Sequence, residues 1–386
     1  MKRFLFQAAV LSILSACGGE PPPPAAPPPA PPAPEPAPVA TTTAAEPAKP
    51  AEPTPEEMKK AEAAKKLAEE RAKWEDAEKA ETARWTPELH AEAKALAEKN
   101  FPDIKAALTG AMAGHHRKPG DADRDKFRHP VETLAFFGLK PNMTVLDIGP
   151  GEGWYTELLA PALAKKGKLM VTGGDPNGPP EARGTFYAQR FKAFLDHSPE
   201  LYGKVQPIVV DGKAPSLGQD GTLDMVLIMR GVHGMHNNGT FKTWLAEINK
   251  GLKPNGVLGV EEHRAKADAN PDESAKKGYV PEKWVIDTVE AAGFKLAAKA
   301  EINANAKDTK DYPEGVWTLP PTYELKDKDH DKYAAIGESD RMTLKFVKVT
   351  PKTAAPAAPK TAAPATPAAP KPAAPATPAT PAAPKK

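Results

Sequence analysis

The sequence predicts a doubly wound α/β domain, which is a mostly parallel β-sheet covered by helices on both faces. Two observations lead to this prediction. Apolar runs of strand length alternate with helical segments between about residues 144 and 349, as is typical of such sheets. Three glycines, Gly149, Gly151 and Gly153, fill the turn between the first strand and the first helix of this series, where bare backbone can approach a ligand.

The first seventeen residues predict export. A basic start, Lys2-Arg3, precedes an apolar run at 4–14 that has the length of a signal peptide and is too short to span a bilayer. The run ends at Cys17, the single cysteine of the chain, and this ending resembles a bacterial lipobox. We therefore expect a lipid on Cys17, which would anchor the protein in the cell envelope on the periplasmic side. An ordinary cleaved signal with an incidental cysteine is the alternative.

Gly18 follows the cysteine, as in lipoproteins sent on to the outer membrane. More than half of the 46 prolines lie within about 21–55 and 351–386, and such segments bury too little apolar surface to fold. We divide the chain into five parts. They are the signal peptide and lipobox 1–17, a linker 18–54, a helical spacer 55–113, the α/β domain 114–350 and a disordered tail 351–386.

The segment 55–84 is rich in Ala, Glu and Lys, which favour helix, and opposite charges recur four residues apart. Its few large apolar residues form no heptad seam, so a solvated spacer helix is preferred to a partner-binding coiled coil. The net charge of the chain is +2, and five lysines in the final 36 residues exceed it. The folded part is therefore close to neutral and indicates no nucleic-acid partner.

The remaining elements follow from apolar runs and from helix signals. The predicted strands are 144–148, 168–172, 205–210, 223–229, 257–261, 294–302 and 342–349. The predicted helices are 87–99, 102–113, 130–138, 154–165, 181–196, 239–252 and 281–292. A turn at 253–256 leads into the fifth strand, and a long polar insertion, 303–340, separates the last two strands.

The turn after the first strand carries the most specific pattern. Its spacing is Gly-x-Gly-x-Gly rather than the Gly-x-Gly-x-x-Gly of dinucleotide-binding folds, and Asp147 stands inside the strand just before it. The second strand leads into Gly173-Gly174-Asp175, and the third ends at Asp211. Carboxylates at such strand tips can accept hydrogen bonds from the hydroxyls of a sugar or the amino group of a base.

These elements resemble the class I S-adenosylmethionine-dependent methyltransferases. Two further stretches, 223–226 and 252–257, resemble later landmarks of that family, and the resemblance covers about 124–349. It implies a Rossmann-like, seven-stranded sheet in the order 3-2-1-4-5-7-6 with the last strand antiparallel. It also implies S-adenosylmethionine as cofactor, with Asp147, Gly149, Gly151 and Gly153 at its methionine end, Asp175 at the ribose and Asp211 at the adenine.

A narrower similarity, to a group of predicted exported bacterial methyltransferases, rests on the stretches 124–130, 136–138, 153–156 and 317–321. Methyl transfer needs alignment, and a base where the acceptor is a hydroxyl or a protonated nitrogen. Two histidines that follow the fourth and fifth strands, His233 and His263, are the predicted catalytic residues. His236 and His129 are further candidates, and a loop histidine can also serve only as a surface or hydrogen-bonding residue.

Other residues leave alternatives open. His233 and His236 beside Glu261-Glu262-His263 could form a metal site, although we expect none, because a glycine-containing loop does not hold two histidines on one helix face. Trp154 and Tyr155 could face a sulfonium, with packing against the sheet preferred, and 317–321 could be a lid or a rigid loop.

The leading hypothesis is an envelope-anchored methyltransferase that acts on a small-molecule or envelope substrate. S-adenosylmethionine is made in the cytoplasm, whereas the lipobox directs this chain out of it. A non-catalytic envelope lipoprotein that uses the same fold to bind a ligand or partner is therefore the alternative. A metal-dependent hydrolase is a third possibility. The sequence indicates neither the acceptor nor the oligomeric state.

Overall fold

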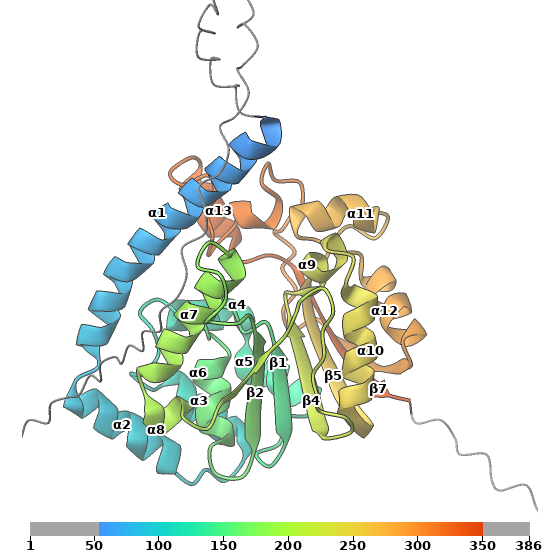
Figure 1. Ribbon diagram of the computed structural model, residues 1–386. Helices are drawn as coiled ribbons and strands as arrows, with labels where there is room; N and C mark the ends of the chain where they lie inside the picture. Colours follow the sequence, from blue (N-terminus) through green and yellow to red (C-terminus); the bar gives the residue numbers. More distant parts are fainter. Residues whose placement is uncertain (1–53, 350–386) are drawn as a thin grey trace, which may run out of the picture. The chain divides into compact units, whose positions relative to one another are not determined.

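The computed structural model describes residues 54–349 and contains the predicted seven-stranded sheet, in the order β3-β2-β1-β4-β5-β7-β6 (Figure 1). β1 pairs in parallel with β2 and β4, β2 with β3, and β4 with β5. β7 runs antiparallel to both β5 and β6. The predicted fold class is therefore confirmed, including the reversed last strand.

The strand boundaries agree closely with the predicted ones. The strands are β1 (Thr144–Ile148), β2 (Lys168–Gly173), β3 (Gln206–Val209), β4 (Leu223–Met229), β5 (Leu252–His263), β6 (Phe294–Ala300) and β7 (Arg341–Lys348). The main difference is β5, which starts five residues before the predicted 257 and includes the predicted turn. Leu252 pairs with Leu223 there, and the register shifts before Met225 pairs with Val257.

Side chains alternate between the two faces of the sheet, as strand geometry requires. Val145 and Leu227 belong to a core formed with α3 (Ile104–Met112) and α6 (Thr156–Leu163). Leu146 and Ile228 point into the opposite core, formed with α10 (Phe241–Gly251) and α12 (Glu282–Ala291). Strands buried on both faces read as continuous apolar runs, which is why they were recognisable in the sequence.

The other helices connect and cover these layers. They are α1 (Pro55–Arg84), α2 (Pro87–Glu98), α4 (Asp125–Arg128), α5 (Pro130–Phe137), α7 (Arg183–Asp196), α8 (Pro199–Tyr202), α9 (Val232–Asn237), α11 (Pro271–Ser274) and α13 (His330–Ile336). Short 3₁₀ turns lie at Ala122–Arg124, Ala275–Lys277 and Gly315–Thr318. None of the short helices α4, α8, α9, α11 and α13 was predicted, since four to seven residues carry almost no periodic signal.

The predicted helical spacer 55–113 is part of the α/β domain, although most of its first helix, 55–84, is exposed as expected. Ala93 of α2 and Ala107, Leu108 and Ala111 of α3 are buried in the core of the domain. The helix α1 lies against α7 (Figure 1), where the rings of Trp74 and Phe186 meet edge to face at 5.7 Å. The physical reason is that small alanines permit close helix packing, which a count of large apolar residues overlooks.

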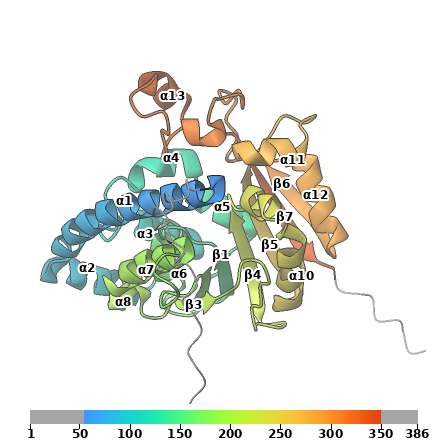
Figure 2. The same ribbon diagram turned by 45° about the horizontal axis from the view of Figure 1, so that its top comes forward.

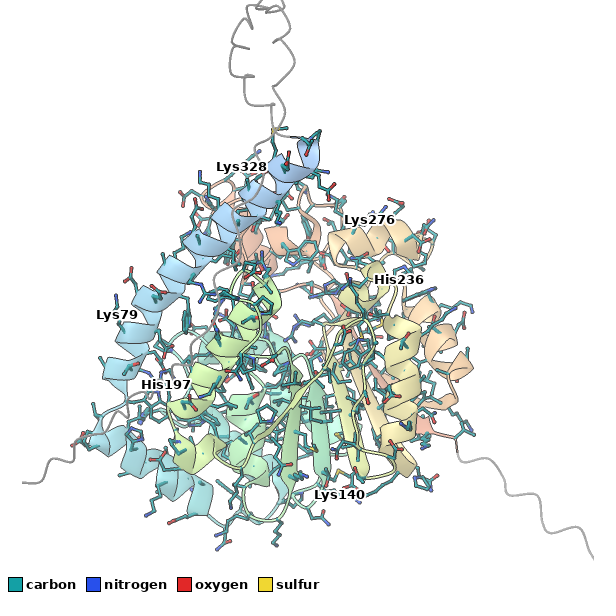
Figure 3. The ribbon with its side chains drawn as sticks, in the orientation of Figure 1. Lys79, Lys140, His197, His236, Lys276 and Lys328 are labelled. Carbon is teal, nitrogen blue, oxygen red and sulfur yellow. The ribbon has the colours of Figure 1, made fainter. Side chains whose placement is uncertain are left out.

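Polar side chains complete the contact between α1 and α7. Arg71 donates to Gln189 at 3.2 Å, and Nε2 of His197, at the end of α7, lies 2.7 Å from a carboxylate oxygen of Glu78 (Figure 3). The insertion 303–340, with α13, lies over the carboxyl ends of β4 and β5 (Figure 2).

Within 54–349, no helix is both long and apolar enough to cross a membrane. The predicted signal peptide with Cys17, most of the proline-rich linker, and the tail 351–386 lie outside the described residues.

Candidate functional site

The turn after β1 presents open backbone. Gly149 and Gly151 have φ angles of +65° and +61°, which favour glycine, and a Cβ atom built on either one would meet nothing within 4 Å. The Gly149 amide donates to Oγ1 of Thr172 on β2 at 3.0 Å, which fixes the turn against the neighbouring strand. Such a turn leaves room for a ligand to approach the main chain closely.

Gly153 has a different role from the predicted one. Its φ is also positive, at +94°, but a Cβ atom there would lie 2.5 Å from the ring of Phe194. The absence of a side chain at Gly153 therefore allows α7 to pack against the turn. The glycine spacing alone could not separate this packing role from a ligand role.

Asp147 lies beneath the turn and is 2% exposed. Its Oδ2 atom is buried and has no hydrogen-bond partner in the structure. Burial raises the pKa of this carboxyl from 3.8 to about 7, and the positive charge of Arg230 opposes the rise. A buried carboxyl with an unused oxygen is costly for the free protein and suits a site that receives a hydrogen-bond donor or a cation from a ligand.

A cavity of about 490 Å³ opens beside this turn. Gly149, Pro150 and Gly151 line it together with the ends of β2 and β3. The opposite wall is α7, which contributes Tyr187 and Phe191. Neither aromatic residue was predicted, and the available signal was their i, i+4 spacing on the helix that follows β2. The volume lies within the range of small-molecule and cofactor pockets.

The two carboxylates predicted at the strand tips are exposed and do not line this cavity. Asp175 accepts the Asn177 amide at 2.8 Å, and Asp211 accepts the Lys213 amide at 2.9 Å. Each therefore stabilises its own turn, a common role of Asp in loops. Gly174 and Pro176, the neighbours of Asp175, do line the cavity, so that carboxylate stands at its rim.

A second cavity, of about 250 Å³, lies over the ends of β4 and β5. It is lined by two histidines, three arginines and parts of the insertion: His233, His263, Arg128, Arg230, Arg341, Val316, Trp317, 320–322, Glu338 and Ser339. The structure therefore brings the two predicted catalytic histidines together, with their ring centroids 5.6 Å apart. Trp317 approaches His233 edge to face at 6.0 Å and belongs to the wall of this cavity, and both interpretations of 317–321, a lid or a rigid loop, stay open.

His233 is held by a buried carboxylate. Its Nδ1 lies 3.0 Å from Oε1 of Glu262, which is fully buried. Burial alone would lower the pKa of His233, but the charge of Glu262 and the hydrogen bond to it raise the pKa above 6.5. With the Nδ1 proton directed at Glu262, Nε2 is the atom left to accept a proton.

His263 differs in its surroundings. Its Nδ1 lies 2.5 Å from Oγ of Ser339. Burial, followed by the charges of His233 and three arginines, lowers its pKa well below 6.5, so it is neutral at pH 7. A group that resists protonation is a poor base, and the arrangement favours His233 over His263 for that role.

The remaining histidine candidates lie elsewhere. His236 meets Asp272 at 2.8 Å and the ring of Trp284 at the surface of α9 (Figure 3). His129 joins α4 to α5 with a φ of +40° and lines a separate cavity with Asn303 and Ile336. It does not line either cavity described above, so the structure does not bring it together with His233 and His263.

The two aromatic residues that follow the glycine turn pack inside the protein, as preferred from the sequence. Trp154 is buried, donates from Nε1 to the Asp121 carbonyl at 2.9 Å, and has the Arg128 guanidinium 4.7 Å from its ring centroid. The Tyr155 hydroxyl lies 3.1 Å from Oε2 of Glu261. Tyr155 therefore links the glycine turn to the charged groups of the second cavity.

His233, Glu262 and His263 form the one group of possible metal ligands among residues 54–349, with ligand atoms within 4.8 Å of one another. His236, which the sequence suggested as a ligand, is not part of it. Glu262 already accepts four hydrogen bonds: from the Val232 amide at 2.5 Å, from the amides of His233 and His263, and from Nδ1 of His233. A carboxylate has about four lone-pair positions, so these bonds favour an anchored histidine over a cation site.

No family model matches the sequence, and no curated protein matches it. Solved structures do match the fold. A SAM dependent methyltransferase from Aquifex aeolicus is 19% identical, with a TM-score of 0.40 over 60% of this chain and 94% of its own. The cyclase SpnF is 17% identical, with a TM-score of 0.42 over 64% of this chain and 93% of its own.

The glycopeptide N-methyltransferase MtfA, complexed with S-adenosyl-L-homocysteine, is 14% identical, with a TM-score of 0.37 over 58% of this chain and 90% of its own. These identities and scores are low, so the argument for an activity rests on this chain's own residues. What the sheet order establishes is the seven-stranded fold that methyltransferases use.

Proposed function

We propose that this chain binds S-adenosylmethionine over the turn after β1 and transfers its methyl group to a small acceptor beside His233. The observation that carries the proposal is the combination at that turn. Open backbone at Gly149 and Gly151 stands above a buried Asp147 oxygen with no partner, next to a cavity of about 490 Å³.

The residues present fit such a cofactor. Asp147 would accept hydrogen bonds from the ammonium group at the amino-acid end of the cofactor. This contact would remove the free-energy cost of a buried oxygen without a hydrogen-bond partner. Gly149 and Gly151 would let that end lie against the main chain, and Tyr187 and Phe191 offer an apolar wall to a base. When bound, the cofactor supplies a methyl group on a sulfonium, which leaves by in-line displacement.

His233 would act as the base of the reaction. Its Nε2 would accept the proton that the acceptor loses, and Glu262 would stabilise the charged imidazolium that results. The carboxylate would also hold the ring in one orientation, as a positioning residue. A positioned general base contributes typically 10²–10⁴-fold to such a proton transfer.

Calorimetry on the full chain tests the proposal. S-adenosylmethionine and its demethylated product, S-adenosylhomocysteine, should both bind the protein with a 1:1 stoichiometry. If neither binds at millimolar concentration, the enzymatic proposal is wrong, and a non-catalytic envelope protein becomes the better explanation.

Anchoring in the cell envelope belongs to the proposal as well. Its support is the sequence at 4–17, which ends in Cys17. Each buried methylene of an attached acyl chain adds about 0.8 kcal/mol of membrane affinity. We expect the full chain to be recovered with membranes and the Cys17→Ser variant to leave that fraction. A variant that stays membrane-bound and still incorporates labelled palmitate would contradict lipidation at Cys17.

A further inference from the structure

The second cavity adjoins a buried chain of alternating charges. Oε2 of Glu261 accepts from Arg230 at 3.0 Å, and Oε1 of Glu261 lies 2.6 Å from Nε of Arg341. Arg341 donates to Glu338 at 2.6 Å, and Glu338 accepts from Nε of Arg128 at 3.0 Å. The chain of charges therefore begins and ends with an arginine, and three guanidinium groups share two carboxylates.

The groups around this chain do not supply the missing negative charge. Arg124, 3.9 Å from Glu338, has its own partner in Asp121 at 3.1 Å. Glu262 is charged, but its hydrogen bonds go to His233 and to backbone amides, and none goes to the three arginines. The charge of Arg230 acts on Asp147 through space, but no hydrogen bond or ion pair joins the two residues. Burial raises the pKa of Asp147 to about 7.

Arg128 is the arginine of this network that keeps unused hydrogen-bond donors. It is 4% exposed, and the described residues give its two Nη nitrogens no hydrogen-bond acceptor, although the side chain lines the cavity. Burial, followed by the charge of Arg230, lowers the pKa of Arg128 to about 10, the direction expected where positive charge is in excess. A buried guanidinium with unused donors costs free energy unless an anion meets it.

We propose that the second cavity binds an acceptor that carries an anionic group, a carboxylate or a phosphate, and that Arg128 holds this group. Guanidinium groups suit both, because their planar array of donors matches two oxygens at once. The volume of about 250 Å³ limits the bound part to a small molecule or to the end of a larger one. The exposed ring of Trp317 provides an apolar surface next to the anion.

This inference rests on the proposed function only in naming the ligand a methyl acceptor. Anion binding itself can be measured without any cofactor. Suitable probes are benzoate, phenyl phosphate and neutral benzyl alcohol, tested on the full chain by ligand-observed NMR and calorimetry. Benzoate and phenyl phosphate should bind more tightly than benzyl alcohol, and the tighter of the two identifies the class of anion.

The variants separate binding from folding. Arg128→Gln leaves two arginines and two carboxylates, so it should keep the fold while anion affinity falls by about tenfold or more. Arg124→Gln is the matched control. It removes a neighbouring arginine that does not line the cavity and should leave anion affinity unchanged.

Equal binding of benzoate and benzyl alcohol, or equal losses in the Arg128 and Arg124 variants, would overturn the inference. Its fate is distinguishable from that of the proposed function. Anion binding without S-adenosylhomocysteine binding would support the site and reject the methyltransferase. S-adenosylhomocysteine binding without anion binding would support the proposed function and reject the anion site.

Discussion

Asp147 shows how a single carboxyl group can lower the stability of the free protein and still be retained. The unfolded carboxyl loses its proton near pH 3.8, whereas the folded one keeps it until about pH 7. Between these values the folded state binds more protons, so stability falls as the pH rises from about 4 to 7, and above 7 the full cost remains without growing further. Such a cost is expected where a ligand, rather than the fold, uses the charge.

The Asp147→Asn variant tests this interpretation. At pH 8 it should be more stable than the wild type by up to about 4 kcal/mol, because the buried charge is gone, and near pH 4 the two should be alike. Its affinity for S-adenosylhomocysteine should fall. Urea denaturation at both pH values measures the first effect. A variant that is less stable than the wild type at pH 8 would show that the carboxylate supports the fold.

The pair formed by Glu262 and His233 makes a second prediction at this scale. Removing the negative charge in Glu262→Gln should lower the pKa of His233, because that charge and the hydrogen bond to it are what raise it. NMR titration of the imidazole signals measures the change. Asp272→Asn, which alters the partner of His236 instead, should leave the His233 titration where it is. If the pKa of His233 is the same in Glu262→Gln as in the wild type, Glu262 does not have the proposed positioning role.

Among the elements, α1 shows how a helix that looks solvated can belong to the domain. Leu67, Arg71, Trp74 and Glu78 recur every three or four residues, and their side chains meet the body of the protein although the rest of the helix is exposed. Only two of these four are large and apolar. The stripe is therefore weak by hydrophobicity and is completed by ion pairs and hydrogen bonds.

Trp74→Ala should weaken the attachment of α1 by about 1–3 kcal/mol, since the indole meets Phe186 edge to face. Hydrogen exchange of the α1 amides should accelerate, while the sheet amides stay protected. Met58→Ala serves as the control, because that side chain is 54% exposed and should have little effect. Equal exchange in both variants would mean that α1 does not depend on the Trp74 contact.

The centre of the sheet was predictable because β1, β2 and β4 are buried on both faces and read as continuous apolar runs. The turn around Gly149 and Gly151 was predictable, since a ligand cradle and a tight turn both need residues without Cβ. The network from Arg230 to Arg128 was not. Its members lie on α4, β5 and β7 and in adjoining loops, and only the fold brings them together. Asp175 and Asp211 each accept a hydrogen bond from a backbone amide two residues further on. The sequence does not reveal whether such a carboxylate stabilises its own turn or faces a ligand.

At the scale of the whole molecule, both cavities lie at the carboxyl ends of the parallel strands. β1 pairs with β4, so the Asp147 end of one strand stands beside Arg230 at the end of the other. The Tyr155 hydroxyl bridges from the glycine turn to Glu261, which belongs to the second cavity's charged network. This arrangement puts a cofactor site and an acceptor site next to each other, as transfer between two bound ligands requires.

The most direct test of this account is the binding of S-adenosylhomocysteine to two glycine variants, measured by calorimetry. Gly151→Ala and Gly221→Ala add the same methyl group at φ angles of +61° and +62°, and in both places the new Cβ atom meets nothing within 4 Å. Only Gly151 lines the cavity beside β1. We predict that Gly151→Ala loses affinity about tenfold or more while Gly221→Ala binds like the wild type. Equal affinity in the two variants would contradict a cofactor site at this turn.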